Sequence, residues 1–242
     1  MAVIDLIKES LQELQKINCE NKISDKNSES RLIFPKYCVG KDKHKDTKRI
    51  SEQEARFLFV RILENQKSFY YSVETPTKER YKDFSKRNKD SSENKPDIAG
   101  ENEGRSASID VTLYEKDDDN NNFCRKHLIE FKQGNVETCK KDFLKLLYDE
   151  DGLTNYYVNI LDRDNIKKWR TLKSIIIDKY KKAIDELPKR VSNNKSTLSI
   201  ILFNIKDGVI IFFKDIEKFF KENDAQSVIE NFIHNKDQDL EI

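Results

Sequence analysis

Three charged residues, Asp110, Glu130 and Lys132, stand between apolar residues and are candidates for catalysis. Asp110 lies in segment 109–114, and Glu130 and Lys132 lie in segment 126–132. Apolar and polar side chains alternate in both segments, which is typical of half-buried β-strands. Two carboxylates and an ammonium group on such strands are candidates for holding a divalent cation and activating a water molecule.

The two strands are predicted to form a hairpin, because the run 117–122 contains only Asp and Asn, residues that favour turns. Pairing the strands about Asn120 sets Asp110 opposite Glu130. Directly opposed residues share a face, with Cβ atoms about 4.5–5.5 Å apart. Lys132 projects from the same face, because side chains alternate along a strand. The apolar residues expected on the other face, in the core, are Ile109, Val111, Ile129 and Phe131.

Two carboxylates this close repel each other unless a cation or a shared proton relieves the repulsion. Mg²⁺ prefers oxygen ligands and is commonly held by one or two carboxylates together with several water molecules. A neighbouring lysine such as Lys132 can orient or deprotonate one of these water molecules. The sequence therefore predicts a Mg²⁺ or Mn²⁺ site suited to hydrolysing a phosphodiester.

This arrangement resembles the D…ExK signature of the PD-(D/E)XK nuclease superfamily, over roughly residues 51–214. The resemblance implies a restriction-endonuclease-like α/β fold, in which helices flank a mixed central sheet. It also implies that Asp110, Glu130 and the backbone carbonyl of Phe131 hold the metal. Lys132 would then position the attacking water.

The resemblance suggests further site residues. Many members of the superfamily carry a glutamate on the helix before the strands, and Glu54 is the best match here. Glu54 also completes a capping-box pattern with Ser51, which explains it equally well as a helix-start residue. The residues expected to contact nucleic acid are Gln133, Lys140, Lys141 and Arg105.

A literal Pro-Asp pair occurs at Pro96 and Asp97, and Asp97 is an alternative metal-binding aspartate. Its neighbours show no strand pattern, so we favour Asp110, although Ile109 stands where the motif has proline. Acid-x-Lys triplets are easy to find in a chain with 37% charged residues. An ordinary hairpin with an exposed, salt-bridged face is therefore the alternative interpretation.

Length and composition limit the class of protein. The chain has 242 residues, 45 Lys and Arg against 44 Asp and Glu, and 36% hydrophobic residues. This favours a folded domain and excludes a uniformly basic nucleic-acid binder, although a local basic surface is compatible with it. No apolar run approaches the ~20 residues of a membrane span. Because no basic leader and no CxxC pair is visible, we expect a cytoplasmic protein without a membrane partner.

Segment 3–17 carries an apolar stripe and predicts an amphipathic helix. We assign it to an extension, residues 1–50, that precedes a nuclease-like domain of residues 51–242. The helix packs either on the main body or on a second copy, so a homo-oligomer or a partner protein is expected there. The other predicted elements are a helix from residue 51, a strand at 69–75, a long loop at 77–105, helices at 136–148 and 166–187, and a hairpin of 198–203 with 209–213.

These observations predict a metal-dependent nuclease that acts on DNA rather than RNA, and the resemblance implies a setting in bacterial or phage defence. Two alternatives stay open. One is a catalytically silent nuclease-like module that binds nucleic acid or protein, and the other is an RNA-cleaving nuclease of the same fold. Because the net charge is only +1, a partner, an oligomer or a local basic segment is expected to bring in the nucleic acid.

Overall fold

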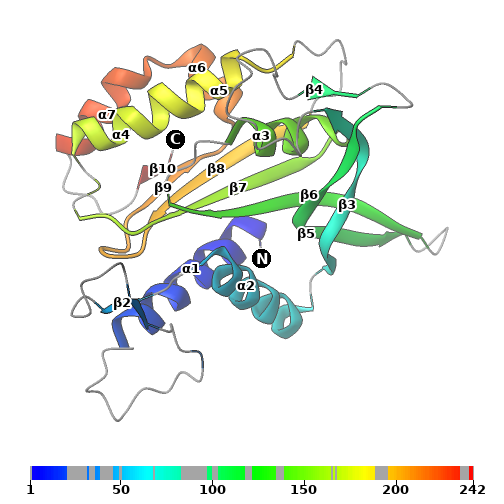
Figure 1. Ribbon diagram of the computed structural model, residues 1–242, viewed down its shortest axis with the longest axis horizontal. Helices are drawn as coiled ribbons and strands as arrows, with labels where there is room; N and C mark the ends of the chain where they lie inside the picture. The colour runs from blue at the N-terminus through cyan, green and yellow to red at the C-terminus, as the bar shows by residue number, and fades with distance from the viewer. Residues whose placement is uncertain are drawn as a thin grey trace.

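A mixed β-sheet separates two layers of helices in the protein (Figure 1). The structure is a computed structural model. It describes residues 2–20, 32, 36–38, 46–48, 51–67, 69–82, 97–99, 103–117, 122–134, 139–164, 166, 168–188, 196–234 and 240–241. Within these residues the sheet has eight strands in the order β10-β9-β8-β7-β6-β5-β3-β4. The fold is therefore α/β with a mixed sheet flanked by helices, as predicted.

The sheet combines an antiparallel half with a parallel centre. Strands β3, β5 and β6 form an antiparallel meander, β6, β7 and β8 are parallel, and β8 and β9 form an antiparallel hairpin. The strands are β3 (Tyr70–Lys82), β4 (Asp97–Ile98), β5 (Arg105–Asp117), β6 (Asn122–Gln133), β7 (Thr154–Leu161), β8 (Thr197–Asn204), β9 (Ile210–Phe213) and β10 (Leu240–Glu241). A separate antiparallel pair consists of β1 (Lys36–Cys38) and β2 (Asp46–Lys48).

Two helices, α1 (Val3–Glu20) and α2 (Glu52–Gln66), cover one face of the sheet (Figure 1). The apolar stripe of α1, which includes Leu6, Leu11 and Leu14, is fully buried in one cluster with α2 and the strands. Of the two predicted packing partners for this helix, the main body is therefore the one observed.

The opposite face is covered by helices from the second half of the chain (Figure 1). Phe143, Tyr157 and Tyr180 pack there, with the Phe143 and Tyr157 ring centroids 5.0 Å apart. A π-helical turn, η1 (Ile176–Lys181), interrupts this layer between α4 and α5. The α-helices are α3 (Cys139–Tyr148), α4 (Trp169–Ile175), α5 (Lys182–Asp185), α6 (Ile216–Glu222) and α7 (Ala225–His234). None of the described helices is both long and apolar enough to cross a lipid bilayer.

The predicted register of the central hairpin is confirmed in part. Val111 pairs with Ile129 and Leu113 with His127, as expected from pairing about Asn120, but a bulge after Leu113 shifts the register by one residue nearer the turn. The predicted pair of Asp110 with Glu130 lies one step beyond the last observed pair. The turn itself, residues 118–121, lies outside the described residues. The predicted hairpin of β8 and β9 is also confirmed.

Two predictions about the strands are wrong. Part of the predicted loop at 77–105 is strand, because β3 continues to Lys82 and pairs with β4 and β5. Its side chains there are mostly exposed, so backbone pairing rather than an apolar pattern forms the strand. Ile109 packs in the cluster on the α3 face, not with Val111. The pairing of β5 with β6 ends at Val111, and the alternation of the hairpin does not continue past it.

Candidate active site

The candidate site lies where β5 and β6 separate. Their pairing ends at Val111 and Ile129, after which β5 stays with β3 and β6 stays with β7. The Asp110 carboxylate fills the gap, because its Oδ2 atom accepts a hydrogen bond of 2.8 Å from the backbone N–H of Phe131. A side chain thus replaces the cross-strand backbone partner. This fixes Asp110 beside the residues that flank Phe131.

Glu130 is the most deeply buried charged group of the site, at 1% exposure. Its Oε1 atom lies 2.5 Å from Nζ of Lys145 on α3, and its Oε2 atom lies 3.3 Å from Nζ of Lys132. Lys145 also donates a 2.9 Å hydrogen bond to the carbonyl of Ser108 and lies 3.2 Å from Oδ1 of Asp142. Both oxygens of Glu130 are therefore held by lysines.

Burial and the neighbouring charges together raise the pKa values of Glu130 and Lys132. Burial raises the pKa of Glu130 to about 8, with Asp142 and Asp110 adding to the shift and Lys145 opposing it. Burial alone would lower the pKa of Lys132, but the neighbouring carboxylates of Asp142, Glu130 and Asp110 outweigh it and raise that pKa. Lys132 is therefore an ammonium group at neutral pH. It can donate hydrogen bonds but is not poised to accept a proton.

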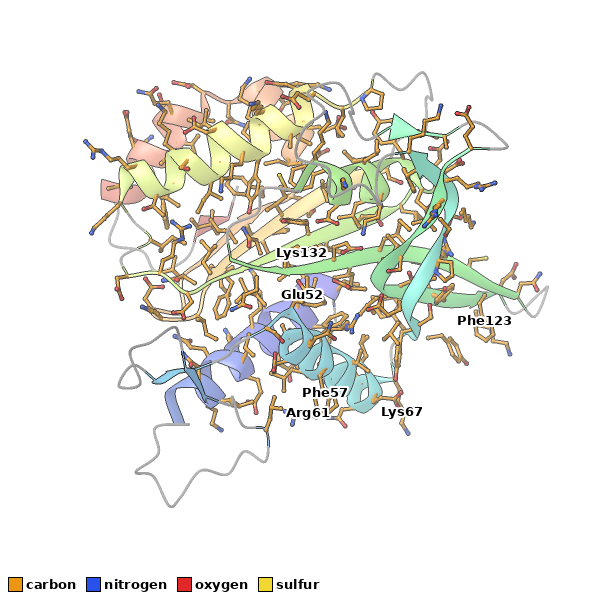
Figure 2. All side chains as sticks on the ribbon, viewed as in Figure 1. Glu52, Phe57, Arg61, Lys67, Phe123 and Lys132 are labelled. Atoms are coloured by element: carbon orange, nitrogen blue, oxygen red, sulfur yellow. The ribbon has the colours of Figure 1, made fainter. Side chains whose placement is uncertain are left out.

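Helix α2 adds two charged side chains to the site from the other face of the sheet. Nη1 of Arg56 lies 3.4 Å from Oδ1 of Asp110 and also contacts the carboxylate of Glu74. Burial raises the pKa of Glu52, Lys132 opposes the shift, and Asp110 adds to it, so all three groups are close enough to interact. Figure 2 labels Glu52 at the start of α2 and Lys132 on β6. Glu52 is thus the α2 glutamate that faces the site.

Glu54, the glutamate selected from the sequence, has a different role in the structure. Its carboxylate accepts a 2.9 Å hydrogen bond from the backbone N–H of Ser51, and Ser51 caps α2. The capping box that the sequence predicts is present. The side chain of Glu54 is therefore directed to the start of its own helix.

The residues expected to contact nucleic acid come from three different elements. Gln133 is exposed at the end of β6, and Arg105 is exposed at the start of β5. Nζ of Lys140 lies 3.1 Å from Oε2 of Glu186, and Lys141 is partly buried on α3. The alternative aspartate, Asp97, pairs with Lys82 at the far end of β3, and its side chain lies outside the described part of the chain.

The structure thus brings together Asp110, Glu130 and Lys132, as the sequence predicts. Sequence reasoning missed the other charged residues that surround them, which are Glu52, Arg56, Glu74, Asp142 and Lys145. One signal was available, because Glu52 and Arg56 are spaced i,i+4 and so share one face of a helix. The positions of Asp142 and Lys145 depend on how α3 packs, which no local pattern specifies.

The donor set at Asp110 and Glu130 fits a hard cation. No group of three or more His, Cys, Asp or Glu side chains gathers as a metal site within the described residues. Two carboxylates and a backbone carbonyl are nevertheless a donor set that Mg²⁺ uses, since water molecules complete its coordination. The raised pKa of Glu130 indicates that the two lysines do not fully offset the burial of its carboxylate. Additional positive charge would therefore be accommodated there.

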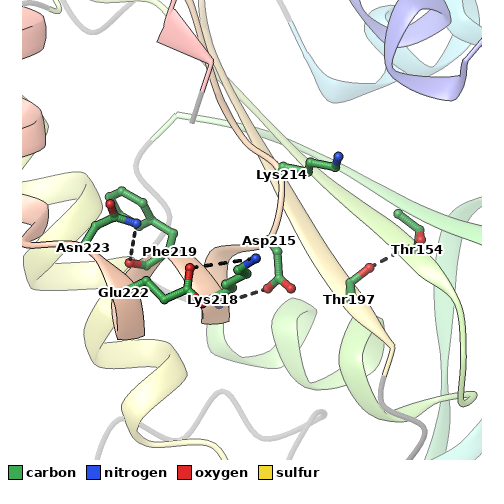
Figure 3. A pocket seen from close by; sticks show the side chains of 8 residues that line it. All are labelled: Thr154, Thr197, Lys214, Asp215, Lys218, Phe219, Glu222 and Asn223. Atoms are coloured by element: carbon green, nitrogen blue, oxygen red, sulfur yellow. Dashed lines mark hydrogen bonds and ion pairs between the residues drawn. The ribbon is translucent and has the colours of Figure 1, made fainter.

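A separate hollow lies between the first residues of β7 and β8 and helix α6 (Figure 3). The two carboxylates of this hollow have local partners on α6. Nζ of Lys218 lies 3.8 Å from Oε2 of Glu222, and Oδ1 of Asp215 accepts a 3.1 Å hydrogen bond from the backbone N–H of Lys218. Asp215 therefore serves as the N-cap of α6, and Glu222 belongs to a surface ion pair. We therefore place the candidate active site at Asp110 and Glu130.

Comparisons with known proteins do not extend the assignment. The chain matches no protein-family model, no curated protein and no solved structure. Evidence for function therefore comes from the chain's own residues, in particular from the charged groups that meet between β5 and β6.

Proposed function

We propose that the protein is a metal-dependent nuclease of the PD-(D/E)XK type that hydrolyses phosphodiester bonds, with DNA as the preferred substrate. One observation carries the proposal. Asp110, Glu130 and Lys132 meet at the point where two strands separate, and Asp110 is fixed there by the N–H of Phe131. An ordinary salt-bridged hairpin would place such residues on an exposed face, whereas Glu130 is 1% exposed.

Each residue has a role that its surroundings support. Asp110, Glu130 and the carbonyl oxygen of Phe131 would hold Mg²⁺ or Mn²⁺, which supplies positive charge that stabilises the phosphate during hydrolysis. Lys132 stays protonated and donates a hydrogen bond to the attacking water or to a phosphate oxygen. Glu52, whose pKa is raised by burial, accepts the proton that the water loses. The water oxygen bonds to phosphorus, one P–O ester bond breaks, and the leaving oxygen takes a proton from solvent.

Cleavage assays on single-stranded DNA, duplex DNA and RNA, with Mg²⁺ or Mn²⁺, test the proposal. Asp110→Asn, Glu130→Gln and Lys132→Met should each slow cleavage by at least about a hundredfold. Matched controls are Glu115→Gln and Lys126→Met, an exposed pair 3.2 Å apart on the same hairpin, which should cleave at the wild-type rate. Wild-type activity in the three site variants would contradict the proposal. The three substrates also decide between DNA and RNA.

A second function, a catalytically silent module that binds nucleic acid, is favoured by one observation. Both oxygens of Glu130 already contact a lysine, Lys132 or Lys145, so the carboxylate has cationic partners without a metal. A metal that binds only the folded protein raises its stability by RT ln(1 + [L]/Kd). The nuclease should therefore show an increase in Tm with Mg²⁺ that Asp110→Asn abolishes, whereas the silent module should show none.

A further inference from the structure

Arg56 carries unused hydrogen-bond donors beside the candidate metal site. Its Nη1 atom contacts Glu74 and, at 3.4 Å, Asp110, and its Nη2 atom contacts the side-chain oxygen of Gln53. An arginine has more N–H donors than these contacts use, and the described residues offer the guanidinium no further acceptor. The side chain is 17% exposed, so these donors can be reached from solvent.

Two features of the present partners of Arg56 allow a phosphate to compete with them. The 3.4 Å contact with Asp110 is longer than the roughly 2.7–2.9 Å of a strong charge-assisted hydrogen bond. The carboxylate of Glu74 is 53% exposed, and ion pairs with exposed carboxylates contribute little. A phosphate oxygen can therefore replace either partner.

Glu74 adopts an unusual backbone conformation to reach Arg56. Its φ angle is +49°, in the left-handed region that non-glycine residues seldom adopt, yet it lies within β3. Its neighbours Val73 and Thr75 pair with Val111 and Ile109, which places Glu74 across from Asp110. The hydroxyl of Ser108 donates a 2.9 Å hydrogen bond that holds its carboxylate. Such strain is often found at functional sites, and here it turns an acceptor toward Arg56.

An exposed apolar surface continues from Arg56. Arg56 lines a groove between α2 and β3 together with Phe57, Val60 and Val73. Phe57 is 59% and Val73 49% exposed. An exposed ring beside a cation suits a nucleotide, because the ring can stack on a base while the cation binds the adjacent phosphate. Bases in a duplex are already stacked on both sides. The groove therefore fits an unpaired base.

We propose that Arg56 binds a backbone phosphate of single-stranded DNA and that Phe57 stacks on a neighbouring unpaired base, so that the strand enters the site along the groove between α2 and β3. This assignment of substrate rests on the proposed nuclease function for its link to cleavage. Before DNA binds, Glu74 holds the guanidinium in place. The phosphate then takes over from Glu74 and Asp110.

Binding of a fluorescently labelled single strand and of the matching duplex, as a function of salt, tests the role of Arg56. Measurements use full-length protein carrying Lys132→Met, with Mg²⁺, so that the DNA stays intact. Arg56→Gln should weaken single-strand binding by about tenfold and reduce the salt slope by about 0.7, the value for one lost phosphate contact. The control is Arg61→Gln, one turn along α2 and paired with Glu13, which should leave both unchanged (Figure 2). Equal behaviour of the two variants would overturn the role of Arg56.

Phe57→Ala should weaken single-strand binding by roughly 5- to 150-fold, the range for one lost stacking contact, and leave duplex binding unchanged. The control is Phe123→Ala, an equally exposed phenylalanine on the hairpin of β5 and β6, which should bind like the parent protein (Figure 2). An equal loss on duplex and single strand, or the same loss in the control, would overturn the stacking role.

Two further variants test the holding role of Glu74 and separate the binding role of Arg56 from an effect on folding. Glu74→Gln should tighten single-strand binding, because the guanidinium is released, and weaker or unchanged binding would overturn the holding role of Glu74. If Arg56→Gln lowers the Tm, Arg56→Lys keeps the charge without the forked donors and should still bind more weakly than the parent. Binding equal to the parent would count against the phosphate contact.

The outcomes also distinguish this inference from the proposed function, because cleavage is measured separately on the wild type. Metal-dependent cleavage together with binding that ignores Arg56 and Phe57 would overturn the inference alone. Binding that depends on both residues, without any metal-dependent cleavage, would overturn the nuclease alone. Loss of both would overturn both.

Discussion

Mg²⁺ binding should strengthen steeply as the pH rises, because a proton and the metal compete for Glu130. A carboxylate must lose its proton to hold a metal, and burial raises the pKa of Glu130 to about 8. With that pKa, the ionised fraction rises from about 3% at about pH 6.5 to about 76% at about pH 8.5. The apparent affinity for Mg²⁺ should therefore rise about 25-fold over this interval, equivalent to about 1.9 kcal/mol.

Calorimetric titration of Mg²⁺ at a series of pH values measures this directly. The variant Glu130→Gln removes the titrating carboxylate, so its remaining affinity for Mg²⁺ should be weak and nearly independent of pH in this range. Glu115→Gln, on the exposed part of the same hairpin, should follow the wild type. A wild-type affinity that does not change with pH, or a pH dependence that survives in Glu130→Gln, would refute the reasoning.

Two further predictions concern neighbours of Glu130. Lys145→Met removes a cation that lowers the pKa of Glu130, and an opposite charge at such distance is worth about 1–3 pKa units. The rise in Mg²⁺ affinity should therefore move to higher pH by about that amount in the same titration, and an unshifted profile would contradict the contact. Glu54→Ala should lower the free energy of unfolding in urea by about 0.5–2 kcal/mol, because it removes half of a capping box, and leave cleavage per folded molecule unchanged. Glu52→Gln should do the reverse and slow cleavage without destabilising the protein. Equal effects of the two variants would contradict the assignment of Glu54 to the helix cap and of Glu52 to the active site.

The central hairpin could be predicted from the sequence because two local signals agree. The Asp-Asn run fixes where the chain turns, and the alternation of apolar residues fixes which side chains share a face. The observed pairing of Val111 with Ile129 matches pairing about Asn120, but neither signal indicates the bulge after Leu113 that shifts the register nearer the turn. By contrast, the second half of β3 carries mostly exposed polar side chains. It is held by backbone pairing near the edge of the sheet, which leaves no apolar signal in the sequence.

The position of Glu54 has a local physical cause that the sequence already contained. A capping box directs the third residue of a helix back to the cap, so the carboxylate of Glu54 is engaged by Ser51. Glu52 lies i,i+4 from Arg56, and residues with this spacing lie on the same face of a helix. The two predictions made for Glu54, a cap and a catalytic group, were therefore in competition. The cap is the one that the structure forms.

In the proposed nuclease, the charges of the site would let a chain with a net charge of +1 bind a polyanion. Without a metal, Arg56 lies against Asp110, while Lys132 and Lys145 hold Glu130. In the proposed nuclease, a divalent cation on these two carboxylates would take Glu130 from Lys132 and Asp110 from Arg56, next to the groove proposed for the DNA. Arg56 would keep its contacts with Glu74 and Gln53. The cations would then face phosphate oxygens in place of carboxylates. Under this proposal the local basic surface is not a fixed patch that composition could reveal, because it would form only when the carboxylates are occupied.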